Sequence, residues 1–217
     1  MNSVTKRNRI PTPCLALVTD SSLFSSIEDL VRAVSLALDG GVDLVQLREK
    51  QLPAEALFAL AVKLRAVTIG RAIFLINDRI DVALGCEADG VQIGEEGMPL
   101  TTVRSLLGQD LLMGCSTHGS QRTILAETYG ADFLVAGSIF HSRTHPERSP
   151  YGLSLLSETC RSTRLPILAI GGITSPRVKT VLEAGASGIA VIQAILGSHD
   201  PLNAARGLRS SLDKSWE

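Results

Sequence analysis

Eight short apolar runs alternate with longer segments of helical periodicity along this chain of 217 residues. The runs that we interpret as strands occupy residues 14–20, 43–48, 72–76, 90–93, 111–115, 133–136, 167–170 and 188–192. Parallel strands need long crossover connections, and right-handed crossovers place all the helices outside a closed sheet. The alternation therefore predicts an α/β protein: a single (β/α)8 TIM barrel over residues 13–217, preceded by a flexible N-terminal tail at residues 1–12.

Two observations separate a closed barrel from an open, doubly wound sheet. The open sheet usually carries a G-x-G-x-x-G turn after its first strand, whereas residues 20–24 here read DSSLF. Similar segments also precede every second strand, with the sequences GVDLV (41–45), EADGV (87–91), GADFL (130–134) and GASGI (185–189). This spacing of two βα units favours a repeating barrel. The alternative is that αβ loops simply prefer Gly and Asp.

Composition narrows the classes of function. The formal net charge of -1 argues against general nucleic-acid binding, which leaves a basic stripe. No apolar run approaches the ~18 residues of a membrane span. Four cysteines without a CxxC pair predict reduced thiols and a cytoplasmic location: Cys14, Cys86, Cys115 and Cys160. We expect no nucleic-acid or membrane partner. The sequence leaves open whether the protein forms a homo-oligomer.

Polar residues or glycines follow each of the eight predicted strands. In a barrel these C-terminal strand ends meet at one face, where active sites lie, and this convergence predicts an enzyme. Gly171 and Gly172 after the seventh strand predict a phosphate cradle, because glycine lets backbone N–H groups approach an anion. Two ordinary turn glycines are the alternative.

The second predicted strand ends in alternating polar side chains. With strict pleating Gln46, Arg48 and Lys50 share one face, and two cations with an amide at the barrel mouth suit an anionic ligand such as a diphosphate. A strand-end salt bridge to Glu49 or Asp78 is the alternative reading of these cations.

Two further strand ends carry titratable groups. Asp78, after the third strand, is a candidate Mg²⁺ ligand or, alternatively, the N-cap of the short helix that follows. His118 lies beside two hydroxyls and is a candidate general acid or base, or a hydrogen-bonded wall residue. His141 and His145 lie in a polar loop, where solvated side chains are the plain interpretation.

Together these motifs resemble the thiamine phosphate synthase and thiazole tautomerase superfamily over about residues 14–205. The motifs that carry the resemblance are LVTD (17–20), QLREK (46–50), NDR (77–79), STH (116–118), GSIF (137–140), AIGGI (169–173) and GIAV (188–191). Each motif alone is weak, but in this order at the strand ends they are fairly specific.

The synthase branch implies coupling of hydroxymethylpyrimidine diphosphate with thiazole phosphate, through a dissociated pyrimidine cation, to give thiamine phosphate and pyrophosphate. The implied catalytic residues are Ser116, His118 and Lys50, and the implied Mg²⁺ ligand is Asp78. The implied substrate-binding residues are Gln46, Arg48, Lys50, Asn77, Ser142, Thr144, His145, Gly172, Val191, Ile192 and Gln193.

Three positions depart from the synthase pattern. Gly97 stands where a second metal-binding aspartate is usual, His145 where a lysine is usual, and Gln193 where a serine is usual. Losing a carboxylate and a cation weakens a diphosphate–metal site. Glu95 or Glu96 is a candidate replacement for the missing carboxylate.

The departures keep other functions open. The tautomerase branch isomerises a carboxythiazole phosphate without a metal, with a histidine matching His118 as its acid–base group. That branch tends to lose the strand 2 and strand 3 motifs, which this chain keeps. A non-catalytic barrel that binds thiazole phosphate or thiamine phosphate is a further alternative, and another phosphate-handling barrel, such as an epimerase, is a weaker one.

Overall fold

The computed structural model describes residues 10–141 and 150–216, and within them the strands close into a parallel barrel in the order β1-β2-β3-β4-β5-β6-β7-β8. The strands are β1 (Cys14–Val18), β2 (Leu44–Leu47), β3 (Ile73–Asn77), β4 (Gly90–Ile93), β5 (Leu112–Thr117), β6 (Phe133–Gly137), β7 (Ile167–Ile170) and β8 (Gly188–Val191). β8 pairs with β1, which closes the ring, so the predicted single (β/α)8 barrel is confirmed.

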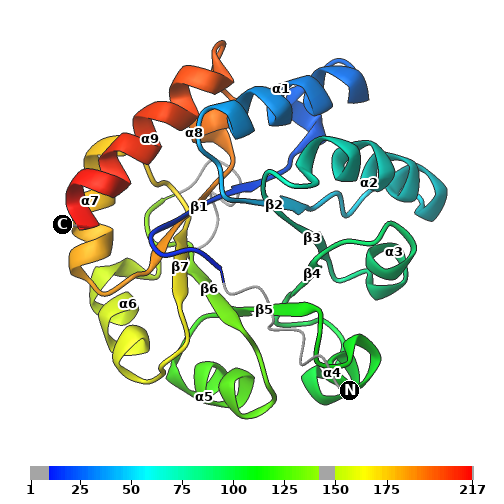
Figure 1. The fold of residues 1–217 in the computed structure, drawn as a ribbon. Helices are drawn as coiled ribbons and strands as arrows, with labels where there is room; N and C mark the ends of the chain where they lie inside the picture. The colour runs from blue at the N-terminus through cyan, green and yellow to red at the C-terminus, as the bar shows by residue number, and fades with distance from the viewer. Residues whose placement is uncertain (1–9, 142–149, 217) are drawn as a thin grey trace, which may run out of the picture.

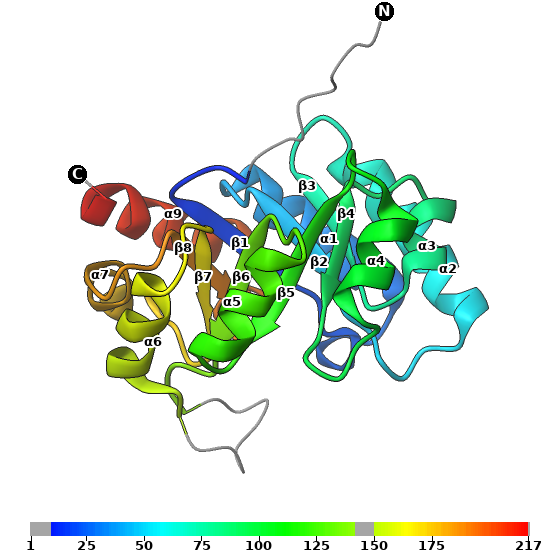
Figure 2. The same cartoon turned by 90° about the horizontal axis from the view of Figure 1, so that it is seen from below.

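Helices surround the strands on the outside of the barrel (Figure 1). They are the 3-10 helix η1 (Ser21–Leu23), α1 (Ile27–Asp39), α2 (Ala54–Thr68), α3 (Ile80–Gly85), α4 (Leu100–Leu107), α5 (Ser120–Thr128), α6 (Gly152–Arg161), α7 (Ser175–Glu183), α8 (Gln193–Leu196) and α9 (Pro201–Trp216). The side view shows the helices standing around the inclined strands (Figure 2). Across residues 10–141 and 150–216, every helix falls short of the length and apolar character needed to traverse a bilayer.

Strand alternation divides the apolar residues into two cores. In β1, Cys14, Ala16 and Val18 belong to the cluster inside the barrel, whereas Leu15 and Leu17 belong to the larger cluster between strands and helices. This is the period-two pattern of a strand that is buried on both faces. The same parity in the other strands decides which polar side chains reach the barrel mouth.

The internal repeat has a structural cause. The Asp132 carboxylate accepts a hydrogen bond from the backbone N–H of Met113 at 2.8 Å and forms an ion pair with Arg104 at 2.8 Å. The other two aspartates of the repeat make equivalent contacts: Asp43 with Leu15 and Arg209, and Asp89 with Phe74 and Arg65. The repeated aspartate therefore ties an even-numbered strand to the odd-numbered strand before it, which a general preference of loops for Asp does not explain.

The described part of the chain begins inside the predicted N-terminal tail. Residues 1–9 lie outside it, but Ile10 is buried, with 6% of its surface exposed, among the residues of the inner barrel core. Ile10, at the end of the predicted tail, thus packs into the barrel, and the flexibility of the tail stays a prediction.

Candidate active site

A cavity of about 720 Å³ opens at the C-terminal ends of the strands. Its lining includes many of the residues predicted from sequence: Gln46, Arg48, Asn77, Ser116, His118, Gly172, Val191, Ile192 and Gln193. These residues come from the ends of five different strands and meet because parallel strands end at one face of the barrel. The roles assigned to them from sequence stay predictions.

A chain of side-chain hydrogen bonds crosses the ends of β2 and β3. Gln46 donates through Nε2 to Oδ1 of Asn77 at 2.9 Å, and Asn77 donates through Nδ2 to Oδ2 of Asp78 at 2.7 Å. The other carboxylate oxygen of Asp78 accepts from the backbone N–H of Gly94 at 2.8 Å. Asp78 thus bridges to the β4 loop and does not cap α3, whose N-cap residue Arg79 makes no side-chain cap bond.

Lys50 is not among the residues that line the cavity. β2 ends at Leu47, and Lys50 occupies an exposed turn beyond it, so it does not continue the pleat of Gln46 and Arg48 as the strict alternation predicted. The reason is that the Glu49 carboxylate accepts hydrogen bonds from Ser21 at 2.6 Å and Thr19 at 2.7 Å, which pulls the chain toward β1. Glu49 therefore accepts hydrogen bonds from the end of β1 and the loop after it, and forms no described ion pair with Arg48 or Lys50.

His118 is paired with a carboxylate from the neighbouring strand end. Its Nδ1 lies 2.8 Å from Oε2 of Glu95, and its ring meets that of Tyr151 edge to face at 6.3 Å between centroids. Burial raises the pKa of the Tyr151 hydroxyl, which keeps that group neutral. Glu95 is therefore directed to His118, and Glu96 is exposed, so neither candidate replacement carboxylate joins Asp78 in the arrangement described.

Gly97 lies directly against the Asp78 carboxylate. A Cβ atom added at Gly97 falls 2.9 Å from Oδ1 of Asp78, and one at Gly94 falls 3.5 Å from both carboxylate oxygens. Within the described residues no group of three or more metal-ligating His, Cys, Asp or Glu side chains occurs. Among the residues described at this corner, Asp78 supplies the carboxylate, and one carboxylate completed by ligand phosphate oxygens is a donor set that suits Mg²⁺.

Gly171 and Gly172 hold the loops after β6 and β7 together. Both have positive φ, 101° and 62°, and a Cβ at Gly171 falls 2.5 Å from Cβ of Ser138. A Cβ at Gly172 overlaps the carbonyl oxygen of His141 and lies 2.9 Å from Cβ of Phe140. Glycine is thus required by conformation and by close approach, and Gly172 also lines the cavity, which two ordinary turn glycines need not do.

Some predicted residues cannot be placed. Ser142, Thr144 and His145 lie outside the described residues. His141, by contrast, lines the cavity, and His199 is exposed at the surface.

The cavity also contains residues that the sequence interpretation did not assign. Gln92 is 2% exposed, donates to Oγ of Ser116 at 3.2 Å, and keeps its Oε1 without a partner in the described residues. Its position opposite Asn77 in the β3–β4 ladder was a usable signal, because paired residues of neighbouring strands face the same side. Arg177 of α7 had no such signal, because a helical residue is not placed by strand parity.

Two arginines, Arg48 and Arg177, line the cavity, and its described lining contains no carboxylate. Cations without compensating acids, next to glycine backbone, favour an anionic ligand. The fold and the site together define a (β/α)8-barrel protein whose cavity suits a small anionic ligand.

Comparisons with known proteins identify the family. A family model described as thiamine monophosphate synthase matches residues 15–195, so the chain belongs to that family. A putative thiamine-phosphate synthase of Geobacter sulfurreducens is 42% identical over 201 residues, 91% of this chain and 93% of that protein. A thiamine-phosphate synthase of Synechococcus sp. strain CC9311 is 39% identical over 214 residues, 95% of this chain but only 59% of that protein.

A solved structure supports the same assignment. The thiamine phosphate pyrophosphorylase from Pyrococcus furiosus matches with a TM-score of 0.85 and 35% identity over 94% of this chain and 97% of that one. The chain spans little more than half the length of the cyanobacterial relatives, which are therefore longer proteins with additional sequence.

Proposed function

We propose that this chain is a thiamine phosphate synthase, which joins hydroxymethylpyrimidine diphosphate to thiazole phosphate and releases pyrophosphate. The observation that carries the proposal is a cavity lined by Arg48 and Arg177 whose described residues include no carboxylate, because both substrates are anions. The relatives named above support a transferase rather than the tautomerase that was the alternative from sequence.

The reaction breaks the bond between the pyrimidine methylene carbon and the diphosphate oxygen and forms a bond from that carbon to the thiazole nitrogen. Negative charge develops on the departing diphosphate, where the guanidinium of Arg48 stabilises it. The Gln46–Asn77 hydrogen bond holds two amides at the same strand ends, where they orient the pyrimidine and its diphosphate.

Magnesium fits this corner of the site. Asp78 would hold the ion together with diphosphate oxygens, because Mg²⁺ accepts one or two carboxylates plus substrate phosphates. When bound, the metal neutralises charge on the leaving group. Asn77 orients the Asp78 carboxylate through its 2.7 Å hydrogen bond.

Pyrophosphate release tests the proposal. The wild-type protein, given both substrates and Mg²⁺, is expected to release pyrophosphate and form thiamine phosphate in equal amounts. Asp78→Ala and Arg48→Ala are expected to lower kcat by about 100-fold or more, because each removes a charge that acts on the leaving group. Circular dichroism and melting temperature show whether each variant is folded.

The outcomes separate the proposal from its rivals. A folded wild-type protein that binds both substrates but forms no thiamine phosphate rejects the synthase and leaves a non-catalytic binding barrel. Metal-independent isomerisation of a carboxythiazole phosphate that is lost in His118→Ala indicates the tautomerase. Absence of any response to thiazole phosphate points to another phosphate-handling barrel.

A further inference from the structure

Arg177 is fixed at the rim of the cavity by two different contacts. It is the third residue of α7, and its Nη1 donates to the carbonyl oxygen of Gly172 at 2.6 Å. Its guanidinium carbon also lies 4.5 Å from the centroid of the Phe140 ring, in a cation–π contact. A hydrogen bond in the guanidinium plane and an aromatic ring against its face together restrict the orientation of the side chain.

The platform for Arg177 is itself held by backbone contacts. Phe140 donates its backbone N–H to the carbonyl oxygen of Gly171 at 3.1 Å, and Ile139 donates to Ile170 at 2.8 Å. Gly172 allows this approach because a Cβ there falls 2.9 Å from Cβ of Phe140. The guanidinium is therefore oriented by the loops after β6 and β7 before any ligand binds.

Most of the hydrogen-bonding capacity of Arg177 is unused. A guanidinium carries five N–H donors, and within residues 10–141 and 150–216 its single hydrogen bond is that to Gly172. It also makes no ion pair with a described residue, and the described cavity lining holds no carboxylate. A planar cation with free N–H groups at a cavity rim suits bidentate binding of phosphate oxygens.

We propose that Arg177 binds the phosphate of the thiazole substrate and makes the site selective for the phosphorylated thiazole over the free alcohol. The inference rests on the proposed synthase function and names a specificity-determining residue for it. Arg177 is hydrogen-bonded to Gly172 and lines the same cavity as the β8–α8 turn. The guanidinium and the glycine backbone can therefore bind the same phosphate group.

The two arginines of the cavity serve different anions in this arrangement. Arg48 follows β2 and Arg177 follows β7, with β1 and β8 between these strands in the closed barrel. Arg48 lies beside the Gln46–Asn77 pair, whereas Arg177 contacts the glycine turn. In this arrangement Arg48 binds the diphosphate of the pyrimidine substrate and Arg177 binds the monophosphate of the thiazole substrate.

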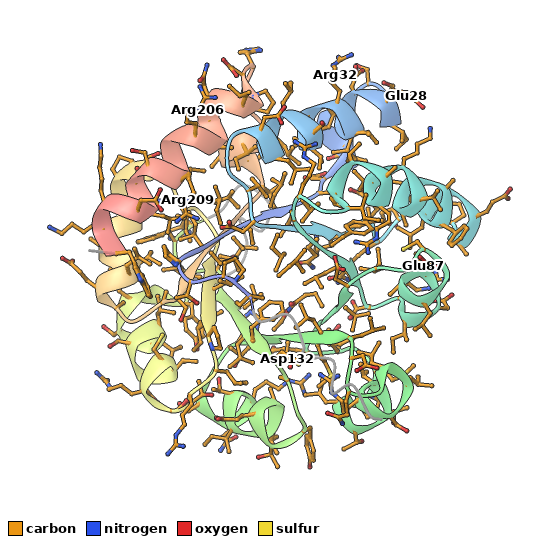
Figure 3. The ribbon with its side chains drawn as sticks, viewed as in Figure 1. Glu28, Arg32, Glu87, Asp132, Arg206 and Arg209 are labelled. Atoms are coloured by element: carbon orange, nitrogen blue, oxygen red, sulfur yellow. The ribbon has the colours of Figure 1, made fainter. Side chains whose placement is uncertain are left out.

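The test compares Arg177→Ala and Arg177→Lys with Arg206→Ala. Arg206 carries the same charge on α9 at the outside of the barrel and is absent from the cavity lining, so it controls for net charge (Figure 3). Calorimetry measures the Kd of thiazole phosphate, of the free thiazole alcohol and of pyrophosphate, and steady-state kinetics measures KM in the full-length protein.

Arg177→Ala is expected to raise the Kd and KM for thiazole phosphate about 10- to 100-fold, as for loss of a charge-assisted hydrogen bond. Binding of the thiazole alcohol and of pyrophosphate is expected to stay within about twofold, as in Arg206→Ala. Arg177→Lys recovers part of the affinity, because the charge remains without the planar guanidinium.

Two results overturn the proposal. One is wild-type affinity of Arg177→Ala for thiazole phosphate. The other is an equal loss for the phosphorylated and free thiazole, which indicates a packing role instead. Because binding is measured without turnover, failure of the synthase reaction in the wild-type protein overturns the proposed function separately and leaves the result on phosphate binding readable.

Discussion

The side-chain amide of Asn77 donates a hydrogen bond to the Asp78 carboxylate across 2.7 Å, while its oxygen accepts one from Gln46. One residue thereby connects the group assigned to the pyrimidine with the group assigned to the metal. Asn77, at the end of β3, therefore links the amide of Gln46 to the Asp78 carboxylate next to it.

This coupling predicts the effect of Asn77→Ala. Removing the amide frees the Asp78 carboxylate to rotate and leaves Gln46 without its partner, so kcat/KM is expected to fall about 10- to 100-fold. Asn203→Ala is the matched control, because Asn203 makes the same 2.7 Å bond to Asp200 on the surface. Steady-state kinetics of pyrophosphate release measures both, and equal activity of the two variants contradicts the predicted coupling.

We predict that replacing Gly97 with aspartate raises the affinity of the site for Mg²⁺. The Cβ position of Gly97 lies 2.9 Å from Oδ1 of Asp78 and 2.8 Å from Cγ2 of Ile93, so these side chains shift when Gly97→Asp places a second carboxylate beside the first. The two acids repel each other without a cation and hold Mg²⁺ together, so the Mg²⁺ concentration that gives half-maximal activity is expected to fall about tenfold. Gly97→Asn is the uncharged control, and the same fall in that variant contradicts a charge-based cause.

The repeated aspartates predict a stability effect outside the active site. Asp132 and Arg104 have side chains only 16% and 11% exposed, so Asp132→Ala leaves a nearly buried guanidinium without its counter-ion and the Met113 N–H without its acceptor. The carbonyl oxygens of Gly108, Leu111 and Gly130 still accept hydrogen bonds from Arg104 in that variant. Breaking such a pair costs about 3 to 5 kcal/mol of unfolding free energy. Urea denaturation measures it against Glu28→Ala, whose exposed ion pair with Lys63 is expected to leave the transition unchanged. The two acids are labelled in Figure 3.

We predict that the buried thiol of Cys115 lowers the stability of the protein at alkaline pH. Burial raises the pKa of the Cys115 thiol from 9.0 to about 12, so above pH 9 the unfolded chain loses a proton that the native protein keeps. The unfolding free energy then falls with rising pH, by about 1.4 kcal/mol per pH unit for this thiol between those two values. Urea unfolding from pH 8 to 11 under reducing conditions measures the slope. Cys115→Ser is expected to make the slope shallower, and an unchanged slope contradicts the assignment.

Strand parity explains how much of the site could be predicted from the sequence. Alternation places Gln46 and Asn77 at the inner side of neighbouring strand ends, and the structure lines one cavity with both. The same rule applies to Gln92, which pairs with Asn77 in the ladder but was not assigned a role. Local periodicity was sufficient wherever a residue belongs to a strand.

Residues beyond the strands depend on contacts that periodicity does not encode. Lys50 lies outside the cavity because Glu49 bonds to Ser21, 28 positions earlier in the chain. Arg177 reaches the cavity because the loop that carries Phe140 packs against Gly172. Both outcomes follow from close approaches between loops far apart in sequence, which no single segment reveals.

We predict that Gly172→Ala weakens the binding of thiazole phosphate. A second glycine variant separates this effect from the cost of backbone strain. Gly172→Ala and Gly70→Ala both place a side chain at positive φ, 62° and 71°, which costs about 1 to 2 kcal/mol in either case. Nothing lies within 4 Å of the Cβ position at Gly70, whereas at Gly172 the new methyl group meets Phe140 at 2.9 Å and displaces the loop that supports Arg177. Both variants are expected to have a lower melting temperature than the wild-type protein. Only Gly172→Ala is expected to raise the Kd for thiazole phosphate, by about tenfold or more, in calorimetry. Equal Kd values in the two variants mean that the glycine turn does not form part of the phosphate site.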